Sequence, residues 1–164
     1  EICQRHNALL HCDMVQTVGH FPLNLKDLQV DFATASAHKF HGPKGIGVIY
    51  INSDLKIPPL NHGGAQERNM RGGTENVAAI VGVSKALQIA KENQQSHTEH
   101  IRSLKQHMMD RFMQEVHDVK FNGLSAYMDQ SLYTVLNVSL PSTDDNDMLL
   151  FNLDIQGIIL RARN

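Results

Sequence analysis

The sequence has little of several features that mark specialised classes of protein. Its 164 residues carry a formal net charge of −2 with histidine neutral, and contain 11 glycines and 5 prolines. The balanced charge argues against a broad nucleic-acid surface, so no DNA partner is expected. The modest glycine and proline counts exclude collagen-like and low-complexity chains. No run of about eighteen apolar residues is present, so we expect no membrane-spanning helix.

Cysteine is also scarce. Cys3 and Cys12 are the two cysteines, and no Cys-x-x-Cys motif is present, so neither a zinc knuckle nor a thioredoxin-type site is indicated. No signal-peptide pattern is visible, and with only two thiols this predicts a reducing, cytoplasmic setting. Cys12 lies in an apolar stretch, which favours a small buried side chain over a reactive thiol.

The composition itself is that of an ordinary globular protein. Hydrophobic residues make up 41% and charged residues 20%, enough apolar side chains for a core of normal size. Short apolar segments predict strands at residues 8–12, 31–36 and 45–51, with a helical turn within 23–30. Strands separated by helical pieces favour an α/β fold with a mainly parallel sheet.

The second half of the chain predicts a long connector helix and a smaller domain. Residues 74–116 place apolar side chains at helical spacing, with Thr74 as N-cap and a bend at 93–96. We therefore predict two domains, at residues 1–95 and 96–164. Further elements are strands at 118–121, 132–140 and 155–160, and a helix at 144–152 capped by Ser142 or Thr143.

No metal site is predicted, although the chain has 10 histidines. His97, His100 and His107 fall on the predicted helix without the carboxylate pattern of a zinc motif. A solvated helix face accounts for them better.

Polar side chains follow two of the predicted strands. Asp13 ends the first strand, Gln16 follows it, and Lys39 comes shortly after the second strand. Because the carboxyl ends of parallel strands share one edge of a sheet, these groups are expected to converge. A pyridoxal 5′-phosphate (PLP) site needs an amine that attaches the cofactor covalently and a carboxylate that pairs with the ring nitrogen. A turn-forming aspartate and a solvated lysine are the alternative interpretation.

Three segments also carry a family resemblance. They are residues 11–19 (HCDMVQTVG), 31–47 (DFATASAHKFHGPKGIG) and 63–76 (GGAQERNMRGGTEN). In order and spacing they resemble the motifs of cysteine desulfurases, within the class V aminotransferases. The resemblance implies a PLP-dependent transferase (aspartate aminotransferase-like) fold. Residues 1–95 would then be the C-terminal part of the PLP-binding large domain, and 96–164 a connector helix and the start of the small domain.

The resemblance implies roles for particular residues. Lys39 would be the Schiff-base lysine and a proton shuttle, and Asp13 would pair with the pyridinium nitrogen. Arg68 and Arg71 would order the loop and a dimer contact, with direct contact to the substrate as the alternative. The other implied cofactor contacts are Gln16 with the phenolic oxygen, Ser36 and His38 with the phosphate, and Thr74 with the phosphate of the other subunit of a homodimer.

The implied reaction is the removal of sulfur from L-cysteine, which leaves L-alanine. A protein cysteine takes the sulfur as a persulfide and passes it to an acceptor protein for iron–sulfur clusters or thiolation. In the family that cysteine lies in a Ser/Gly-rich loop. Here the chain runs from Gly157 through Ile158 and Ile159 to the segment 160–163, which resembles a family segment found after the loop. Neither Cys3 nor Cys12 matches the missing cysteine.

Other parts of the family site are missing too. They are the phosphate-cradling turn, the ring-stacking histidine and the arginine that grips the substrate carboxylate. Both ends of the chain look like cuts inside a larger fold. Three classes stay open for the parent protein: a cysteine desulfurase, another class V enzyme such as a selenocysteine lyase or an aminotransferase, and a non-catalytic relic.

We predict that this chain alone is inactive, whereas its parent is a desulfurase. The measurement is alanine and sulfide release from cysteine by the isolated 164-residue chain, with no release above background as the expected result. Substantial turnover by the isolated chain would contradict this expectation.

Overall fold

The computed structural model describes residues 1–142 and 148–161. The chain forms two compact units, Glu1–Thr98 and Glu99–Asn164, whereas the predicted boundary lay between residues 95 and 96. The predicted long helix is present as α3 (Val77–Glu92) and α4 (Gln94–Glu115), and the expected bend falls at Asn93 between them.

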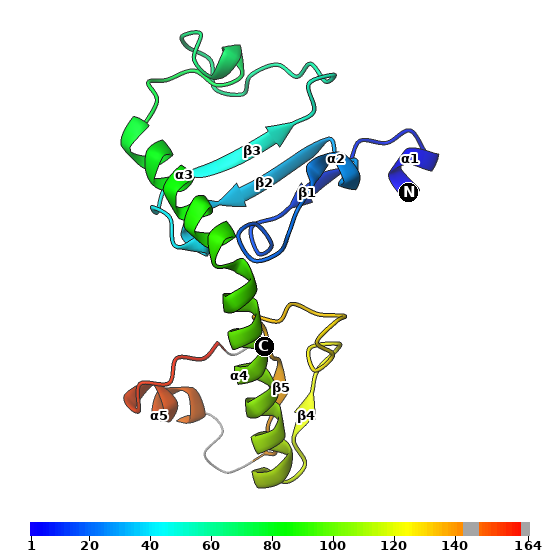
Figure 1. Ribbon diagram of the computed structural model, residues 1–164, viewed down its shortest axis with the longest axis vertical. Helices are drawn as coiled ribbons and strands as arrows, with labels where there is room; N and C mark the ends of the chain where they lie inside the picture. The colour runs from blue at the N-terminus through cyan, green and yellow to red at the C-terminus, as the bar shows by residue number, and fades with distance from the viewer. Residues whose placement is uncertain (143–147, 162–164) are drawn as a thin grey trace. The chain divides into compact units, whose positions relative to one another are not determined.

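A three-stranded sheet forms the centre of the first unit (Figure 1). Its strands lie in the order β1 (His11–Asp13), β2 (Phe32–Ser36) and β3 (Gly47–Ile51). β1 and β2 run parallel, as predicted, and Asp13 pairs with Thr34. The short helices α1 (Ile2–Arg5) and α2 (Leu25–Leu28) precede β1 and β2. The two carboxyl ends of β1 and β2 therefore meet at one edge.

β3 departs from the predicted parallel arrangement and runs antiparallel to β2. The link between the two strands is a short turn, the 3₁₀ helix η1 (Ala37–Phe40), followed by residues 41–46. A parallel return needs a crossover of about a dozen residues or more, usually through a helix. The compact link therefore sends the chain back in the opposite direction.

The core of the first unit consists of two small clusters. Met14, Val30 and Ala33 form one, and Cys12 packs against it, although it is half-buried rather than buried as predicted. The other joins the buried residues Ala37, Phe40 and Val83. Since Val83 belongs to α3, the second cluster fastens η1 to that helix.

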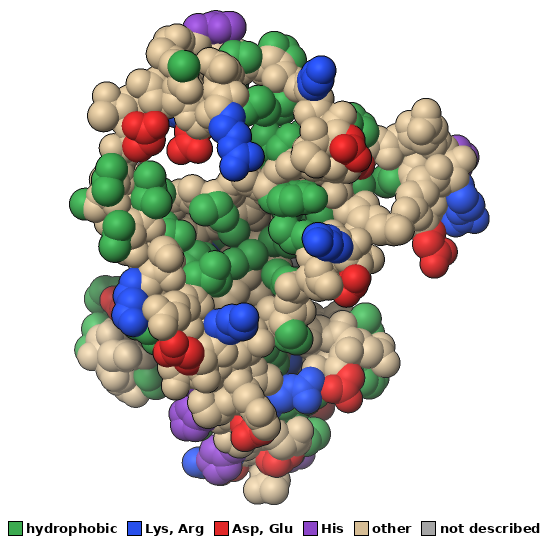
Figure 2. All heavy atoms as spheres, turned by 45° about the horizontal axis from the view of Figure 1, so that its top comes forward, with side chains coloured by type: hydrophobic (Ala, Val, Ile, Leu, Met, Phe, Trp, Pro, Cys, Tyr) green, Lys and Arg blue, Asp and Glu red, His purple; other side chains and the backbone are tan. Residues whose placement is uncertain are grey.

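Large apolar side chains remain on the surface of the first unit. On β3, Val48 and Ile49 are exposed, and on α3 Val77, Ile80 and Val81 are exposed. Figure 2 shows hydrophobic side chains gathered on the surface of the molecule. Large apolar side chains that gather on a surface are typical of contact with another protein.

The second unit contains a two-stranded sheet and the helix α5. β4 (Lys120–Phe121) pairs antiparallel with β5 (Val138–Ser139), so the predicted strands at 118–121 and 132–140 are present but shorter. α5 (Leu149–Ile155) begins after Met148, which makes no side-chain cap, so Ser142 is not its cap. The predicted cap Thr143 and the first residues of the predicted helix lie outside the described residues.

The strand predicted at residues 155–160 is wrong. Ile155 is the last residue of α5, and Gly157 follows with a φ of +78°. The Ile158 N–H then donates to the Leu153 carbonyl at 2.9 Å. A glycine in the left-handed region commonly ends a helix in this way. An apolar run alone did not distinguish this helix end from a strand.

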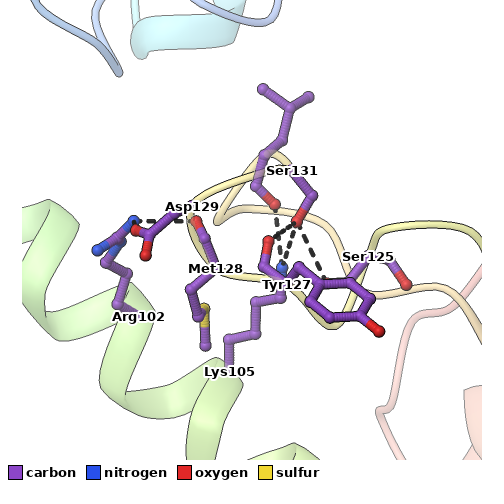
Figure 3. A network of polar contacts seen from close by, with 8 residues as sticks. Arg102, Lys105, Ser125, Tyr127, Met128, Asp129 and Ser131 are labelled. Atoms are coloured by element: carbon purple, nitrogen blue, oxygen red, sulfur yellow. Dashed lines mark hydrogen bonds and ion pairs between the residues drawn. The ribbon is translucent and has the colours of Figure 1, made fainter.

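Two cations on α4 fasten the second unit together (Figure 3). Arg102 Nη2 donates to the Met128 carbonyl at 2.9 Å and to Asp129 Oδ1 at 2.8 Å. About one turn later, Lys105 is 6% exposed. These two side chains hold the loop that contains residues 128–132 against the helix.

The buried ammonium group of Lys105 bonds to neutral oxygens. Its Nζ donates to Ser131 Oγ at 3.3 Å and to the Leu132 carbonyl at 3.2 Å. Burial lowers the pKa of Lys105 below the usual 10.5, and the nearby charge of Arg102 lowers it further. The unfolded chain therefore binds more protons than the folded chain between the lowered pKa and 10.5, so stability rises with pH in that interval.

We predict that Lys105→Met removes part of this pH dependence. As the pH rises from neutral toward 10.5, the free energy of unfolding of the wild type should increase relative to that of the variant. Urea unfolding at a series of pH values measures the difference. Lys120→Met, which removes an exposed lysine of the same unit, is the matched control and should keep the wild-type slope. Equal slopes for wild type and Lys105→Met would contradict the assignment.

Candidate functional site

The candidate lysine projects from a firmly anchored turn. η1 follows β2 directly, and its residues Ala37 and Phe40 are 1% and 3% exposed. Between these two buried side chains, His38 and Lys39 are exposed. The sheet and α3 thus hold the turn, while its two polar side chains remain accessible.

Backbone hydrogen bonds close the turn around Lys39. The Ala37 N–H donates to the Ile46 carbonyl at 3.2 Å, and the Gly42 N–H donates to the Ala37 carbonyl at 2.9 Å. His41, with a φ of +64°, reverses the chain between them. The backbone of Lys39 is therefore constrained from both sides.

Asp13 reaches the same edge of the sheet from the neighbouring strand. It is the last residue of β1 and pairs with Thr34, two residues before the end of β2 at Ser36. Neighbouring strands lie about 4.8 Å apart. The structure therefore brings Asp13, Ser36 and the Lys39 turn to one edge, as predicted from the order of strands.

The environment of Asp13 is compatible with both predicted roles, as a turn-forming residue and as a carboxylate for the cofactor ring. Its Oδ1 accepts the Val15 N–H at 2.9 Å, so the carboxylate does stabilise a turn. The side chain is nevertheless exposed at the strand end. Gln16 is exposed on the same turn. A turn-forming role does not remove either group from the edge.

Thr74, another predicted site residue, does not cap α3. The cap is Asn76, whose Oδ1 accepts the Ala79 N–H at 3.1 Å. The predicted N-cap was therefore wrong, because asparagine caps a helix as well as threonine and α3 begins only at Val77. Thr74 is exposed in the preceding loop, and no hydrogen bond joins it to Lys39 in the part of the chain that the structure describes.

The loop before α3 closes on itself through a backbone approach and a side-chain hydrogen bond. A Cβ at Gly72 would lie 2.8 Å from Gly63 Cα, and the Gly73 N–H donates to Gln66 Oε1 at 3.1 Å. Arg71 Nη1 donates to the carbonyl of the adjacent Gly72 at 2.6 Å, and the loop-ordering role of this arginine stays a prediction. Within the loop, η2 (Glu67–Asn69) contains three consecutive residues with φ values of 48°, 56° and 63°.

One neighbour of Lys39 was missed in the sequence. The Nε2 atom of His20 lies 3.0 Å from the backbone carbonyl oxygen of Lys39. His20 comes directly after the resembling segment 11–19, and no local pattern indicates a contact with a residue so far along the chain.

The chemistry of this edge fits PLP. The amine of Lys39, the carboxylate of Asp13 and the imidazole of His38 are exposed there, and Ser36 is half-buried. Lys39 would attach the cofactor, and Asp13 would face its ring nitrogen.

Among residues 1–142 and 148–161, no group of three or more His, Cys, Asp or Glu could hold a metal ion. The helices of the same residues include none that is long and apolar enough to cross a membrane.

The sequence is similar to proteins of a known family. The chain matches the class-V aminotransferase family over residues 1–162. It is 39% identical over 158 residues to cysteine desulfurase IscS of Clostridium botulinum, covering 96% of this chain and 39% of that protein. For cysteine desulfurase IscS of Methanosarcina thermophila, the identity is 37% over 158 residues, covering 96% of this chain and 38% of that protein.

Two solved structures share the fold of this chain. A NifS-like protein superposes with a TM-score of 0.87 at 37% identity, covering 99% of this chain and 43% of that one. A NifS-like protein from Rickettsia africae superposes with a TM-score of 0.84 at 29% identity, covering 99% and 44%.

The fold is therefore part of a PLP-dependent transferase of fold type I, as predicted. The chain belongs to the class-V aminotransferase family. It spans about two fifths of the length of the cysteine desulfurases it matches. The individual site residues stay predictions.

The two candidate caps of α3 differ in their expected effect on stability. Asn76→Ala removes the hydrogen bond to the Ala79 N–H and should cost about 1 kcal/mol of unfolding free energy. Thr74→Ala removes no cap and should change the same quantity by less than about 0.5 kcal/mol. Urea unfolding compares them, and a larger loss for Thr74→Ala would contradict the observed helix start.

Proposed function

We propose that this chain is the lysine-bearing part of a cysteine desulfurase that uses PLP to release sulfur from L-cysteine, leaving L-alanine. The observation that carries the proposal is the placement of Lys39 on an anchored, exposed turn at the edge that also holds Asp13. The similarity to proteins named cysteine desulfurase supports the choice of substrate.

Each residue at the edge has a defined task in this proposal. When bound, PLP supplies an electron sink for the bonds of the substrate amino acid. Lys39 Nζ attaches the cofactor, then accepts and returns a proton. The Asp13 carboxylate keeps a proton on the ring nitrogen, and the Gln16 amide donates to the ring hydroxyl oxygen. Ser36 and His38 bind the phosphate.

The thiol that receives sulfur must come from elsewhere. A thiolate that attacks the substrate sulfur has to be accessible and mobile. Cys12 is half-buried within β1 and packs against the first core cluster, and Cys3 is half-buried in α1. In the balanced step, the substrate C–S bond breaks, the sulfur ends as a persulfide on that outside thiol, and the substrate carbon takes a proton to give alanine.

The same proposal includes a larger assembly. Exposed Val48 and Ile49 on β3, and Val77 and Val81 on α3, support contact with further protein. We place the chain within a longer cytoplasmic polypeptide that forms a homodimer, in which Thr74 contacts the phosphate bound by the partner subunit. A sulfur-acceptor protein would take the persulfide sulfur onward for iron–sulfur clusters or thiolation.

Substitution of the lysine tests the function in the full-length protein that contains this chain. Lys39→Ala should abolish the visible absorbance of lysine-bound PLP, and should lower alanine release from cysteine by at least about a thousandfold. Lys44→Ala is the matched control, since Lys44 is an exposed lysine of the same turn region, and it should retain both properties.

Three results would contradict the proposal. If Lys39→Ala released alanine as fast as the wild type, Lys39 would not be required for the reaction. A wild-type protein that binds PLP but turns over selenocysteine or amino donors, and not cysteine, would be another class V enzyme. A wild-type protein that does not bind added PLP would be a non-catalytic relic.

A further inference from the structure

We propose that His20 is a positioning residue that fixes the direction in which Lys39 leaves its turn. This inference rests on the proposed function only in giving Lys39 the cofactor. The His20 Nε2 atom lies 3.0 Å from the Lys39 carbonyl oxygen. Because a carbonyl oxygen only accepts hydrogen bonds, Nε2 carries the hydrogen in this contact.

The carbonyl of Lys39 needs a donor from outside its own turn. The residue three positions on is Gly42, whose N–H already donates to the Ala37 carbonyl. The next residue is Pro43, which has no N–H to donate. A helix-end carbonyl that lacks a local donor is usually bonded by a side chain or by water. His20 supplies that donor.

The residue next to His20 brings the two segments into direct contact. A Cβ on Gly19 would lie 2.6 Å from the Cβ of Phe40, and Gly19 has a φ of +83°. Only glycine suits this combination of close approach and left-handed backbone. Phe40 immediately follows Lys39 and is buried. The segment 14–20 therefore holds the lysine turn at two neighbouring points, a packed ring and a hydrogen bond.

The contact also joins two halves of the proposed site. The segment 14–20 begins directly after Asp13 and carries Gln16. Val18, in the same segment, packs against both core clusters. The hydrogen bond from His20 to the Lys39 carbonyl therefore fixes the position of the Lys39 backbone relative to Asp13 and Gln16, the groups proposed to contact the cofactor ring. His20 acts through the backbone carbonyl of Lys39.

Two substitutions separate the donor from the bulk of the side chain. His20→Leu removes the hydrogen-bond donor, whereas His20→Gln places an amide nitrogen close to the position of Nε2. Thr17→Val is the control for general loosening, because Thr17 Oγ1 donates to the Met14 carbonyl within the same segment at 3.1 Å. Thermal unfolding of all three variants establishes that each is folded.

The first readout is the rate at which PLP attaches to Lys39 in the cofactor-free full-length protein, followed by absorbance and by mass spectrometry after borohydride reduction. His20→Leu should slow attachment by about three- to tenfold, the equivalent of one hydrogen bond. His20→Gln and Thr17→Val should stay within about twofold of the wild type. A wild-type rate in His20→Leu, no rescue in His20→Gln, or equal slowing in Thr17→Val would each overturn the inference.

The second readout does not depend on the cofactor. Acetic anhydride labels exposed amines, and the ratio of Lys39 to Lys44 acetylation reports the placement of the Lys39 side chain in the apoprotein. His20→Leu should change this ratio by more than about twofold, and His20→Gln should restore it. If the wild-type protein fails to attach PLP, the proposed function fails, and this ratio still decides the role of His20. An unchanged ratio in His20→Leu would then overturn it.

Discussion

The burial of Ala37 and Phe40 is the interaction on which the candidate site depends. These side chains are 1% and 3% exposed, and with Val83 they form the cluster that joins η1 to α3. Burying one phenylalanine ring contributes about 1.5–3 kcal/mol. A single turn of 3₁₀ helix has little stability of its own. The lysine between these two residues therefore takes its position from the cluster rather than from the turn.

Much of the fold is readable from local sequence, because the pattern of apolar residues reports burial. The strands ending at Asp13 and Ser36 and the helical break at Asn93 were predictable for this reason. The convergence of Asp13 and Lys39 followed from one further rule, that parallel strands share their carboxyl edge. The family resemblance added the roles of these residues, which spacing alone left open.

The remaining features depend on information that periodicity does not contain. The direction of β3 is set by the length of the link after β2, since an apolar run reads the same in either orientation. Thr74 and Asn76 are both good caps, and the start of α3 decided between them. The contact between His20 and Lys39 joins residues that are distant in sequence, so it becomes visible only once Gly19 and Phe40 are packed together.

The left-handed turn Glu67–Asn69 has a consequence for how its loop keeps its shape. None of its three residues is glycine, and left-handed backbone costs an L-residue about 1 kcal/mol or more. The approach of Gly63 to Gly72 and the bond from Gly73 to Gln66 hold the two ends of the loop together. These contacts at the ends of the loop therefore offset the conformational cost of the left-handed turn. If the chain were cut within the loop, the three residues would be free to return to right-handed conformations, which have lower energy.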